Sequence, residues 1–288
     1  FRQTMDINEL VGRGTLRETY ERIIEDLIEA EKWLDPSIGY LNRPSKAAAN
    51  AALARVYLSM RQYDKAAEAA SAALGYHDVL MDYNTLNASA ARPFTGAYLG
   101  NNPEIIFNYA MQPYELIASA LASVDTTVYK LYAENDLRKT CFFQLRPAGN
   151  YTFKGSYSGA AQLFGGLSTD ELYVIRAESY ARAGQTQLAL ADLNKLLEKR
   201  FKTGTFKPVS SSDDKILDLV LTERRKQLFG RGARWSDLRR LNKEPARLVT
   251  LTRHLKDGVL TLPPNHNRYV FPIPDDEIRL SGIQQNPR

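Results

Sequence analysis

The chain has 288 residues, of which 44% are hydrophobic and 25% are charged, and its formal net charge is +5. A chain of this length buries roughly three quarters of its unfolded surface in one or two packed units. The charge is too small to require a nucleic acid partner, and no stretch of 18 apolar residues predicts a membrane-spanning helix. The single cysteine, Cys141, lies in an apolar run, where we expect a buried small side chain, and it cannot form an internal disulfide.

The first predicted element is an amphipathic helix over residues 15–34. Thr15 and Glu18 have the spacing of a capping box at its start. Apolar residues recur on one stripe of this helix, namely Leu16, Tyr20, Ile23, Ile24, Leu27, Ile28 and Leu34. We expect the stripe to pack on the core without a ligand role, and Trp33 to be mostly core as well.

The dominant pattern is a pair of alanine-rich helices that occurs twice. Residues 46–60 and 63–74 flank a break at Arg61 and Gln62, and residues 169–197 repeat this layout. An offset of 123 positions places Ala54 on Ala177, Tyr57 on Tyr180, Ala66 on Ala189 and Leu74 on Leu197. The spacing is typical of a tetratricopeptide-type helical pair, in which small residues let antiparallel helices approach closely. The alternative is two unrelated alanine-rich hairpins.

A different kind of sequence lies between the two pairs. Residues 76–166 hold many tyrosines together with Gly, Asn and Pro. Within this segment we expect short β-like runs at 104–109 and 141–145 and helices at 116–123 and 126–134. A long irregular segment on a helical scaffold is where binding residues usually lie.

The last third is predicted to hold short helices and loops. Residues 210–213 are typical of a helix cap, which predicts a helix running to about Phe229, and residues 234–241 predict another. The final fifty residues are loop-rich, with a strand-like run at 268–273. The acidic residues 275–277 follow Pro274 and favour the start of a helix, since negative charge is stabilised at a helix N-terminus.

The final third also carries the most specific motifs. Residues 222–241 read TERRKQLFGRGARWSDLRRL, residues 269–278 read YVFPIPDDEI, and the chain ends in QQNPR. Shorter segments fit in the same order: YERIIEDL at 20–27, RPSKAAA at 43–49, NPEIIF at 102–107, DLR at 136–138 and IRAESYA at 175–181. Together these segments resemble the SusD/RagB family over nearly the whole chain.

The resemblance implies a mainly α fold: a tetratricopeptide-like helical-pair scaffold with a loop-rich, partly β ligand-binding excursion. We expect one SusD-like unit over residues 1–288. Within it, residues 15–75 form the scaffold with the first pair, residues 76–166 the tyrosine-rich excursion, and residues 167–288 the second pair and the C-terminal signature.

The resemblance also implies a function and a location. Members of the family are lipid-anchored on the outer face of the outer membrane of Bacteroidota, where they bind glycans and deliver them to a SusC-like, TonB-dependent transporter. SusD-like proteins are commonly longer than this chain. We therefore expect either a fragment that lacks an N-terminal portion with the lipid anchor, or a shortened relative. The expected partners are therefore a glycan and a SusC-like transporter, with no nucleic acid and no cofactor.

Sugars are bound by aromatic faces that stack on the ring and by side chains that hydrogen-bond the hydroxyls. From the middle segment we select six glycan-binding candidates, which are Tyr98, Asn101, Asn102, Gln112, Tyr114 and Tyr157. Tyr98 and Tyr114 are the preferred pair, because they flank the amides in a loop-like context. For any one tyrosine, half-buried packing is the alternative, and the wider set includes Tyr83, Tyr109 and Tyr151.

Enzyme signatures are absent from the sequence, since no phosphate loop, nucleophile elbow or zinc-ligand spacing occurs. We expect Trp235 to be structural, and the arginines of residues 224–243 to pair with carboxylates such as Glu223, Asp237 and Glu178. Two other functions stay open. One is a tetratricopeptide adaptor that binds peptides in a helical groove, and the other is RNA binding through residues 224–243.

Overall fold

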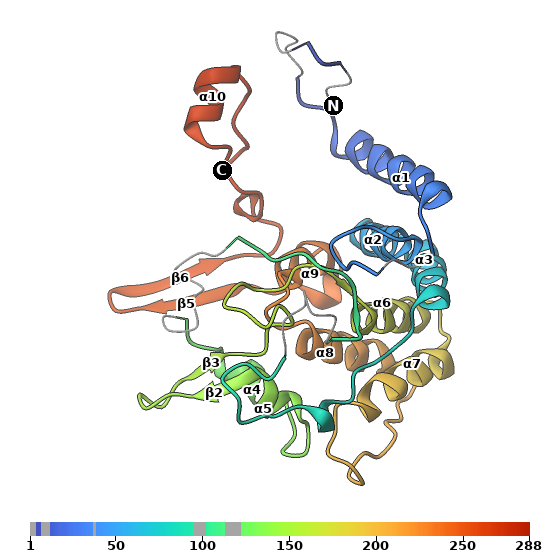
Figure 1. Cartoon of the computed structure of the whole chain (residues 1–288). Helices are drawn as coiled ribbons and strands as arrows, with labels where there is room; N and C mark the ends of the chain where they lie inside the picture. Colours follow the sequence, from blue (N-terminus) through green and yellow to red (C-terminus); the bar gives the residue numbers. More distant parts are fainter. Residues whose placement is uncertain (1–3, 7–11, 37–38, 95–101, 113–121) are drawn as a thin grey trace. The chain divides into compact units, whose positions relative to one another are not determined.

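The computed structural model describes residues 4–6, 12–36, 39–94, 102–112 and 122–288 (Figure 1). The chain divides into two compact units. The central unit is residues 26–234, and the terminal unit combines residues 1–25 with residues 235–288. Helices α1 (Leu16–Trp33) and α9 (Ala233–Leu241) contain the two boundaries.

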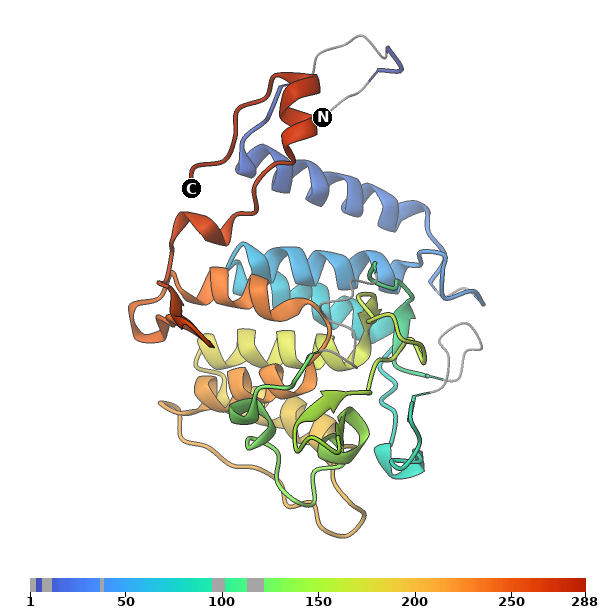
Figure 2. The ribbon, with the colours of Figure 1, turned by 90° about the vertical axis from the view of Figure 1, so that its left-hand side faces the viewer.

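The central unit is built on five helices. They are α2 (Lys46–Ser59), α3 (Tyr63–Tyr76), α6 (Thr169–Arg182), α7 (Thr186–Glu198) and α8 (Ile216–Gln227). Helix α3 packs against α2 and α6, and α6 packs against α7 and α8. Figure 2 shows these helices stacked one above another. The expected mainly helical, tetratricopeptide-like scaffold is therefore confirmed.

The internal repeat is visible in the helix boundaries. Helix α6 begins and ends 123 positions after α2, and α7 begins 123 positions after α3. The four alanines that the repeat aligns, Ala54, Ala66, Ala177 and Ala189, are each 0% exposed. Their burial shows why small residues recur here, because a larger side chain would separate the paired helices.

The turns of the two pairs also correspond. Arg61 and Gly184 both have a left-handed backbone, with φ of 62° and 72°. The next residue, Gln62 or Gln185, donates its backbone N–H to the carbonyl of Tyr57 or Tyr180, in each case over 2.9 Å. The structure therefore confirms the prediction of two equivalent antiparallel hairpins.

Where the structure describes it, the middle segment contains only short elements up to its junction with α6. They are a 3₁₀ turn, Tyr83–Thr85, then β1 (Ile105–Phe107), α4 (Thr126–Tyr129), α5 (Arg138–Phe142), β2 (Phe143–Leu145), β3 (Tyr151–Phe153) and β4 (Leu167–Ser168). Strand β1 pairs antiparallel with β4, and β2 with β3. The structure corrects two predictions: Cys141 and Phe142 end a helix instead of starting a strand, and α4 stops after one turn. The helix expected at 116–123 falls mostly outside the described residues.

Aromatic packing gives the middle segment a core of its own. The buried residues include Met81, Tyr83, Phe94, Ile105, Tyr132, Cys141, Phe142, Phe143, Tyr157 and Phe164. Cys141 is a buried free cysteine, as expected, and burial raises the pKa of its thiol to about 11. It is therefore a protonated, packed side chain near neutral pH.

The terminal unit begins with the predicted capping box. Thr15 Oγ1 accepts from Glu18 N at 3.1 Å, and Thr15 N donates to Glu18 Oε2 at 2.7 Å. The later elements are a 3₁₀ turn, Pro245–Arg247, then β5 (Leu251–Leu255), β6 (Gly258–Leu262), a second 3₁₀ turn, Asn267–Tyr269, and α10 (Asp275–Ser281). Helix α10 follows Pro274 as predicted. The strand-like run at 268–273 is wrong, because the strands of this region form the β5–β6 hairpin before it.

Two further expectations are corrected. Helix α1 has no buried residue, and Trp33 is 81% exposed, with its ring N–H donated to Glu29 Oε1 at 2.8 Å. Helix α8 begins at Ile216 without a side-chain cap, because residues 213–215 form a turn in front of it. Among the described residues, no helix is long and apolar enough to cross a bilayer.

Candidate ligand-binding site

A buried polar network attaches the middle segment to the helical pairs. Glu104, which precedes β1, is 0% exposed and accepts from Arg200 Nη2 at 2.5 Å and from the Tyr157 hydroxyl at 2.6 Å. Arg200 also donates to the carbonyl of Met81 at 2.7 Å. One arginine at the end of the second pair therefore holds two parts of the middle segment.

Asp170, in the first turn of α6, is the second acidic centre of this network. It accepts from Arg231 Nη2 at 2.9 Å and from Gln227 Nε2 at 2.8 Å. The Arg231 guanidinium lies over the Tyr157 ring, 3.7 Å from its centroid. Tyr157 is thus enclosed between two carboxylates and an arginine, and its hydroxyl is 2.5 Å from that of Tyr83.

The pKa shifts show how the network balances its charges. Burial raises the pKa of Glu104, and the attraction of Arg200 offsets this only in part. Burial also acts to raise the pKa of Asp170, but Arg231 and Arg200 outweigh it, so the pKa is lowered. Burial holds the pKa of the Tyr157 hydroxyl well above its ordinary value, so this group is a neutral donor. The network is a support for the fold, with its charges compensated inside the protein.

The basic run at residues 224–243 is partly interior, with Arg234, Arg239 and Lys243 exposed. Arg224, Lys226 and Arg240 are each no more than 5% exposed. Glu223 accepts from Arg138 at 2.8 Å, and Asp237 accepts from Arg240 at 2.9 Å. The expected pairing of the arginines with carboxylates is confirmed for Arg240 and, with Asp170 as the partner, for Arg231. The arginine partners of Glu223 and Glu178 are instead Arg138 and Arg182, from outside the run.

Trp235 is structural, as expected. Its ring packs against Tyr269 at 4.9 Å and Phe271 at 5.6 Å between centroids, and its ring N–H donates to the carbonyl of Tyr269 at 3.2 Å. The motif YVFPIP therefore supplies the partners of the tryptophan in the motif before it.

The six predicted site residues fall into three groups. Tyr98, Asn101 and Tyr114 lie outside the described residues. Asn102 is 1% exposed, and its Oδ1 accepts from Glu104 N at 3.0 Å, while Tyr157 is 0% exposed. Both side chains are held in the interior, which corrects the expectation that they reach a ligand. Gln112 is exposed.

The backbone next to Gln112 is firmly held. Gly165 N donates to the carbonyl of Tyr109, and Met111 N donates to the carbonyl of Leu163. A Cβ atom on Gly165 would lie 3.0 Å from Met111 Cγ, and a Cβ atom on Gly166 would lie 2.1 Å from the carbonyl oxygen of Phe107. The two glycines therefore permit this close approach, and they are the sequence signal that marks it.

Tyr109 is 58% exposed beside this junction. It belongs to the wider set of tyrosines selected from the sequence. Together with Gln112 it gives the middle segment an exposed aromatic ring and an exposed side-chain amide on a fixed backbone. We call these two residues the 109–112 rim.

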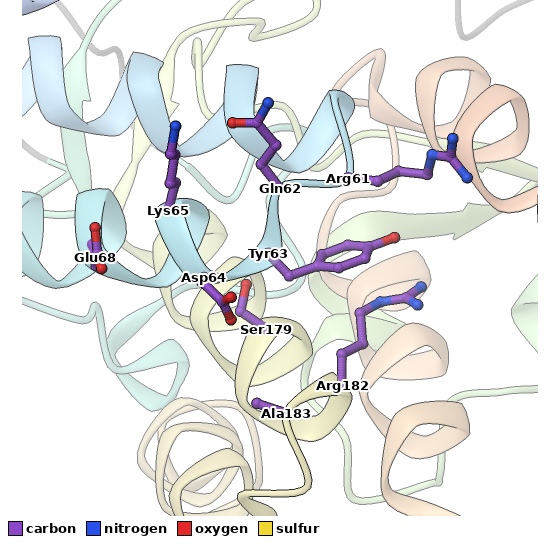
Figure 3. A pocket seen from close by; sticks show the side chains of 9 residues that line it. All are labelled: Arg61, Gln62, Tyr63, Asp64, Lys65, Glu68, Ser179, Arg182 and Ala183. Carbon is purple, nitrogen blue, oxygen red and sulfur yellow. The ribbon is translucent and has the colours of Figure 1, made fainter.

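A separate hollow of about 560 Å³ lies at the turn of the first helical pair. Figure 3 shows the side chains that line it, which are Arg61, Gln62, Tyr63, Asp64, Lys65, Glu68, Ser179, Arg182 and Ala183. None of them is among the site residues predicted from the sequence. Their signal in the sequence is a difference between the repeats. Four of the eight positions 61–68 are charged in the first pair, whereas none of the equivalent positions 184–191 is charged in the second.

Among the described residues, no cluster of three His, Cys, Asp or Glu side chains is placed to hold a metal ion.

Two protein families match parts of this chain. Residues 169–288 match the family model described as the SusD family, and residues 2–58 match a model described as starch-binding, associating with outer membrane. No curated protein matches the sequence significantly.

Several solved structures share the fold. A SusD-like protein from Bacteroides fragilis is 18% identical, with 98% of this chain and 73% of that chain covered and a TM-score of 0.70. A SusD superfamily protein from Bacteroides thetaiotaomicron is 23% identical, with 98% and 69% covered and a TM-score of 0.73. A SusD-like carbohydrate binding protein from Bacteroides vulgatus is 20% identical, with 93% and 65% covered and a TM-score of 0.68.

This chain therefore spans between 65% and 73% of the length of these three structures. The family models match at both ends of the chain, and the helical scaffold has the same fold as SusD-like proteins. The chain belongs to the SusD/RagB family.

Proposed function

We propose that this protein captures an oligosaccharide or polysaccharide at the cell surface and delivers it, uncleaved, to a SusC-like TonB-dependent transporter of the outer membrane. The observation that carries the proposal is the match of residues 2–58 to a model described as starch-binding and associating with outer membrane. The fold shared with a SusD-like carbohydrate binding protein supports it.

The proposed glycan-binding face is residues 76–166. Within the described residues, the 109–112 rim offers what a sugar site requires, because an aromatic face stacks on the ring and an amide hydrogen-bonds a hydroxyl. Tyr98, Asn101 and Tyr114 remain proposed members of the face from the sequence. Asn102 and Tyr157 support it from the interior.

The interior network favours binding through this face. Glu104 and Tyr157 connect the middle segment to Arg200 and Asp170 on the helical pairs. A backbone held in this way loses little conformational freedom when a ligand binds, which leaves more of the interaction energy for affinity.

Affinity electrophoresis in polysaccharide gels, followed by a glycan array, tests the proposal. We expect retardation by at least one polysaccharide, and weaker binding by roughly tenfold in Tyr109→Ala and Gln112→Ala, as for loss of a stacking or hydrogen-bonding group of about 1.4 kcal/mol. Tyr98→Ala and Tyr114→Ala belong to the same series. Tyr40→Ala is the matched control, since Tyr40 is 65% exposed and lies outside residues 76–166.

Two outcomes would contradict the proposal. Release of shortened products from the polysaccharide would indicate an enzyme, and equal loss of binding in Tyr40→Ala would show that the effect is not specific to this face. The transporter step needs its own experiment: isolation of the tagged protein from native outer membranes should recover a TonB-dependent transporter in stoichiometric amount.

A further inference from the structure

The turns of the two helical pairs share one backbone conformation but differ in residue type. The second pair has Gly184 at the left-handed position of its turn, whereas the first pair has Arg61 with φ of 62°. This conformation is unfavourable for residues other than glycine. The repeat shows that glycine suits the turn, so the arginine is kept there against a conformational penalty. Residues held in this way are candidates for a function of their side chain.

The hollow beside this turn has the size of a small-molecule site. Its volume of about 560 Å³ lies inside the range of roughly 300–1,000 Å³ found for ligand pockets. In Figure 3 the guanidinium groups of Arg61 and Arg182 and the hydroxyl of Tyr63 extend to one side, whereas Asp64 and Glu68 lie toward the other. The hollow therefore has a cationic side.

The two cations on this side, Arg182 and Arg61, differ in how their side chains are held. Arg182 donates to Glu178 Oε1 at 2.9 Å and lies over the Tyr63 ring, 4.1 Å from its centroid. Glu178 is 0% exposed, so Arg182 is fixed in place and its charge is compensated. Arg61 is exposed, and within the described residues its side chain has no hydrogen bond or ion pair.

A neutral acceptor completes the lining. Gln62 Oε1 is buried and accepts no hydrogen bond within the described part of the chain. An unpaired acceptor of this kind costs free energy, and a turn of the Gln62 amide toward the hollow would let it accept from a hydroxyl, which sugars supply. The hollow thus combines a guanidinium fork for an anion with an acceptor for a hydroxyl.

We propose that this hollow binds an acidic substituent, a carboxylate or a sulfate, of a saccharide, with Arg61 as its principal contact. The inference rests on the proposed function and extends it to acidic glycans. Arginine is suited to this role because its planar fork makes paired, charge-assisted hydrogen bonds to such anions. The site is distinct from the face at residues 76–166.

Isothermal titration calorimetry on the whole protein tests this. The probes are a galacturonate trimer, its methyl ester, a sulfated galactose trimer and a triglutamate peptide. We expect the galacturonate trimer or the sulfated trimer to bind at least tenfold more tightly than the methyl ester. Comparing the affinities of these two acidic trimers shows whether the site prefers a carboxylate or a sulfate. Arg61→Gly should weaken this binding by about tenfold, as for loss of a charge-assisted contact.

Arg61→Gly is the informative variant, because glycine is the residue of the equivalent turn and should leave the fold intact. Arg253→Ala is the matched control, since it removes one exposed positive charge from strand β5. Binding of the acidic trimers that is unchanged in Arg61→Gly would overturn the inference, as would equal affinity for the ester. Tighter binding of the peptide would assign the hollow to acidic peptides instead.

The proposed function can be judged separately. If Tyr109→Ala abolishes saccharide binding while Arg61→Gly has no effect, the proposed function stands and only this inference fails. If no saccharide binds at all, both fail.

Discussion

Arg61 and Gly184 place two different side chains on the same left-handed backbone. Ala at position 184 should destabilise the fold by about 1 kcal/mol, because a Cβ is disfavoured there. Nothing lies within 4 Å of a Cβ built at Gly184, so the effect would come from the backbone alone. Arg61→Gly should instead stabilise the fold, because glycine has no Cβ that disfavours this backbone. Urea unfolding measures both changes.

Gly75→Ala provides the control for this comparison. Gly75 lies inside α3, again with nothing within 4 Å of a built Cβ. Alanine should stabilise this helical position by roughly 0.5–1 kcal/mol. If all three substitutions change stability with the same sign, the backbone explanation is wrong.

Asp136 has a pKa that is lowered in the folded protein. Burial acts to raise it, but the attraction and hydrogen bonds of Arg138, with the charge of Lys226, outweigh burial. The folded state then binds fewer protons than the unfolded state, so stability is present above the ordinary aspartate pKa of about 3.9 and is lost as pH falls below it. Asp136→Asn should reduce this loss.

The same substitution should lower stability at pH 7 by about 3–5 kcal/mol. It removes the carboxylate that accepts from Arg138 through both oxygens and leaves only Glu223 to compensate this buried charge. Chemical unfolding at pH 7, 4 and 3 separates the two effects. A variant with unchanged stability at pH 7, or with the same slope below pH 4, would show that Asp136 does not carry this interaction. Asp78→Asn, an exposed partner of Lys195, is the control.

At the scale of elements, the paired helices depend on alanine at their contacts. Ala54 and Ala177 are 0% exposed at equivalent positions of α2 and α6. Leucine at either position should destabilise the fold by about 1–3 kcal/mol through overpacking. Thermal or urea unfolding checks this, and Ala191→Leu on the exposed side of α7 should have little effect. A stable Ala177→Leu variant would contradict close packing.

The short elements of the middle segment were the hardest to predict. The apolar run at Cys141–Leu145 fits a strand locally, but α5 extends through Phe142 and the strand is only Phe143–Leu145. Asp136 and Arg138 form their ion pair immediately before and within α5. Their partners Glu223 and Lys226 come from α8, so a contact distant in the sequence helps to fix this helix.

At the scale of the whole molecule, much of the charge of the basic run at 224–243 is withdrawn from the surface, since Arg224, Lys226 and Arg240 are buried. We therefore expect binding of a neutral glycan to change less than about twofold between 50 and 500 mM NaCl, because salt screens only charge interactions. Calorimetry at the two salt concentrations measures this. A steep loss of affinity with salt would indicate that exposed cations, and not stacking and neutral hydrogen bonds, hold the glycan.

The sequence by itself determined the helical pairs, their repeat and the family. These signals are local or ordered along the chain: helical periodicity, alanine at fixed spacing, and motifs such as TERRKQLFGRGARWSDLRRL. The capping box at Thr15 and the start of α10 after Pro274 were predictable for the same reason, since each depends on residues within one helical turn.

Only the tertiary structure decided which polar and aromatic side chains face a ligand. Tyr157 and Tyr109 lie in the same kind of sequence, yet one is 0% and the other 58% exposed. Tyr157 is buried because Glu104, Asp170 and Arg231 meet around it from three distant parts of the chain. The hollow at Arg61 likewise needs α6 beside the first turn. Burial and cavities depend on contacts between distant residues, which no local pattern records.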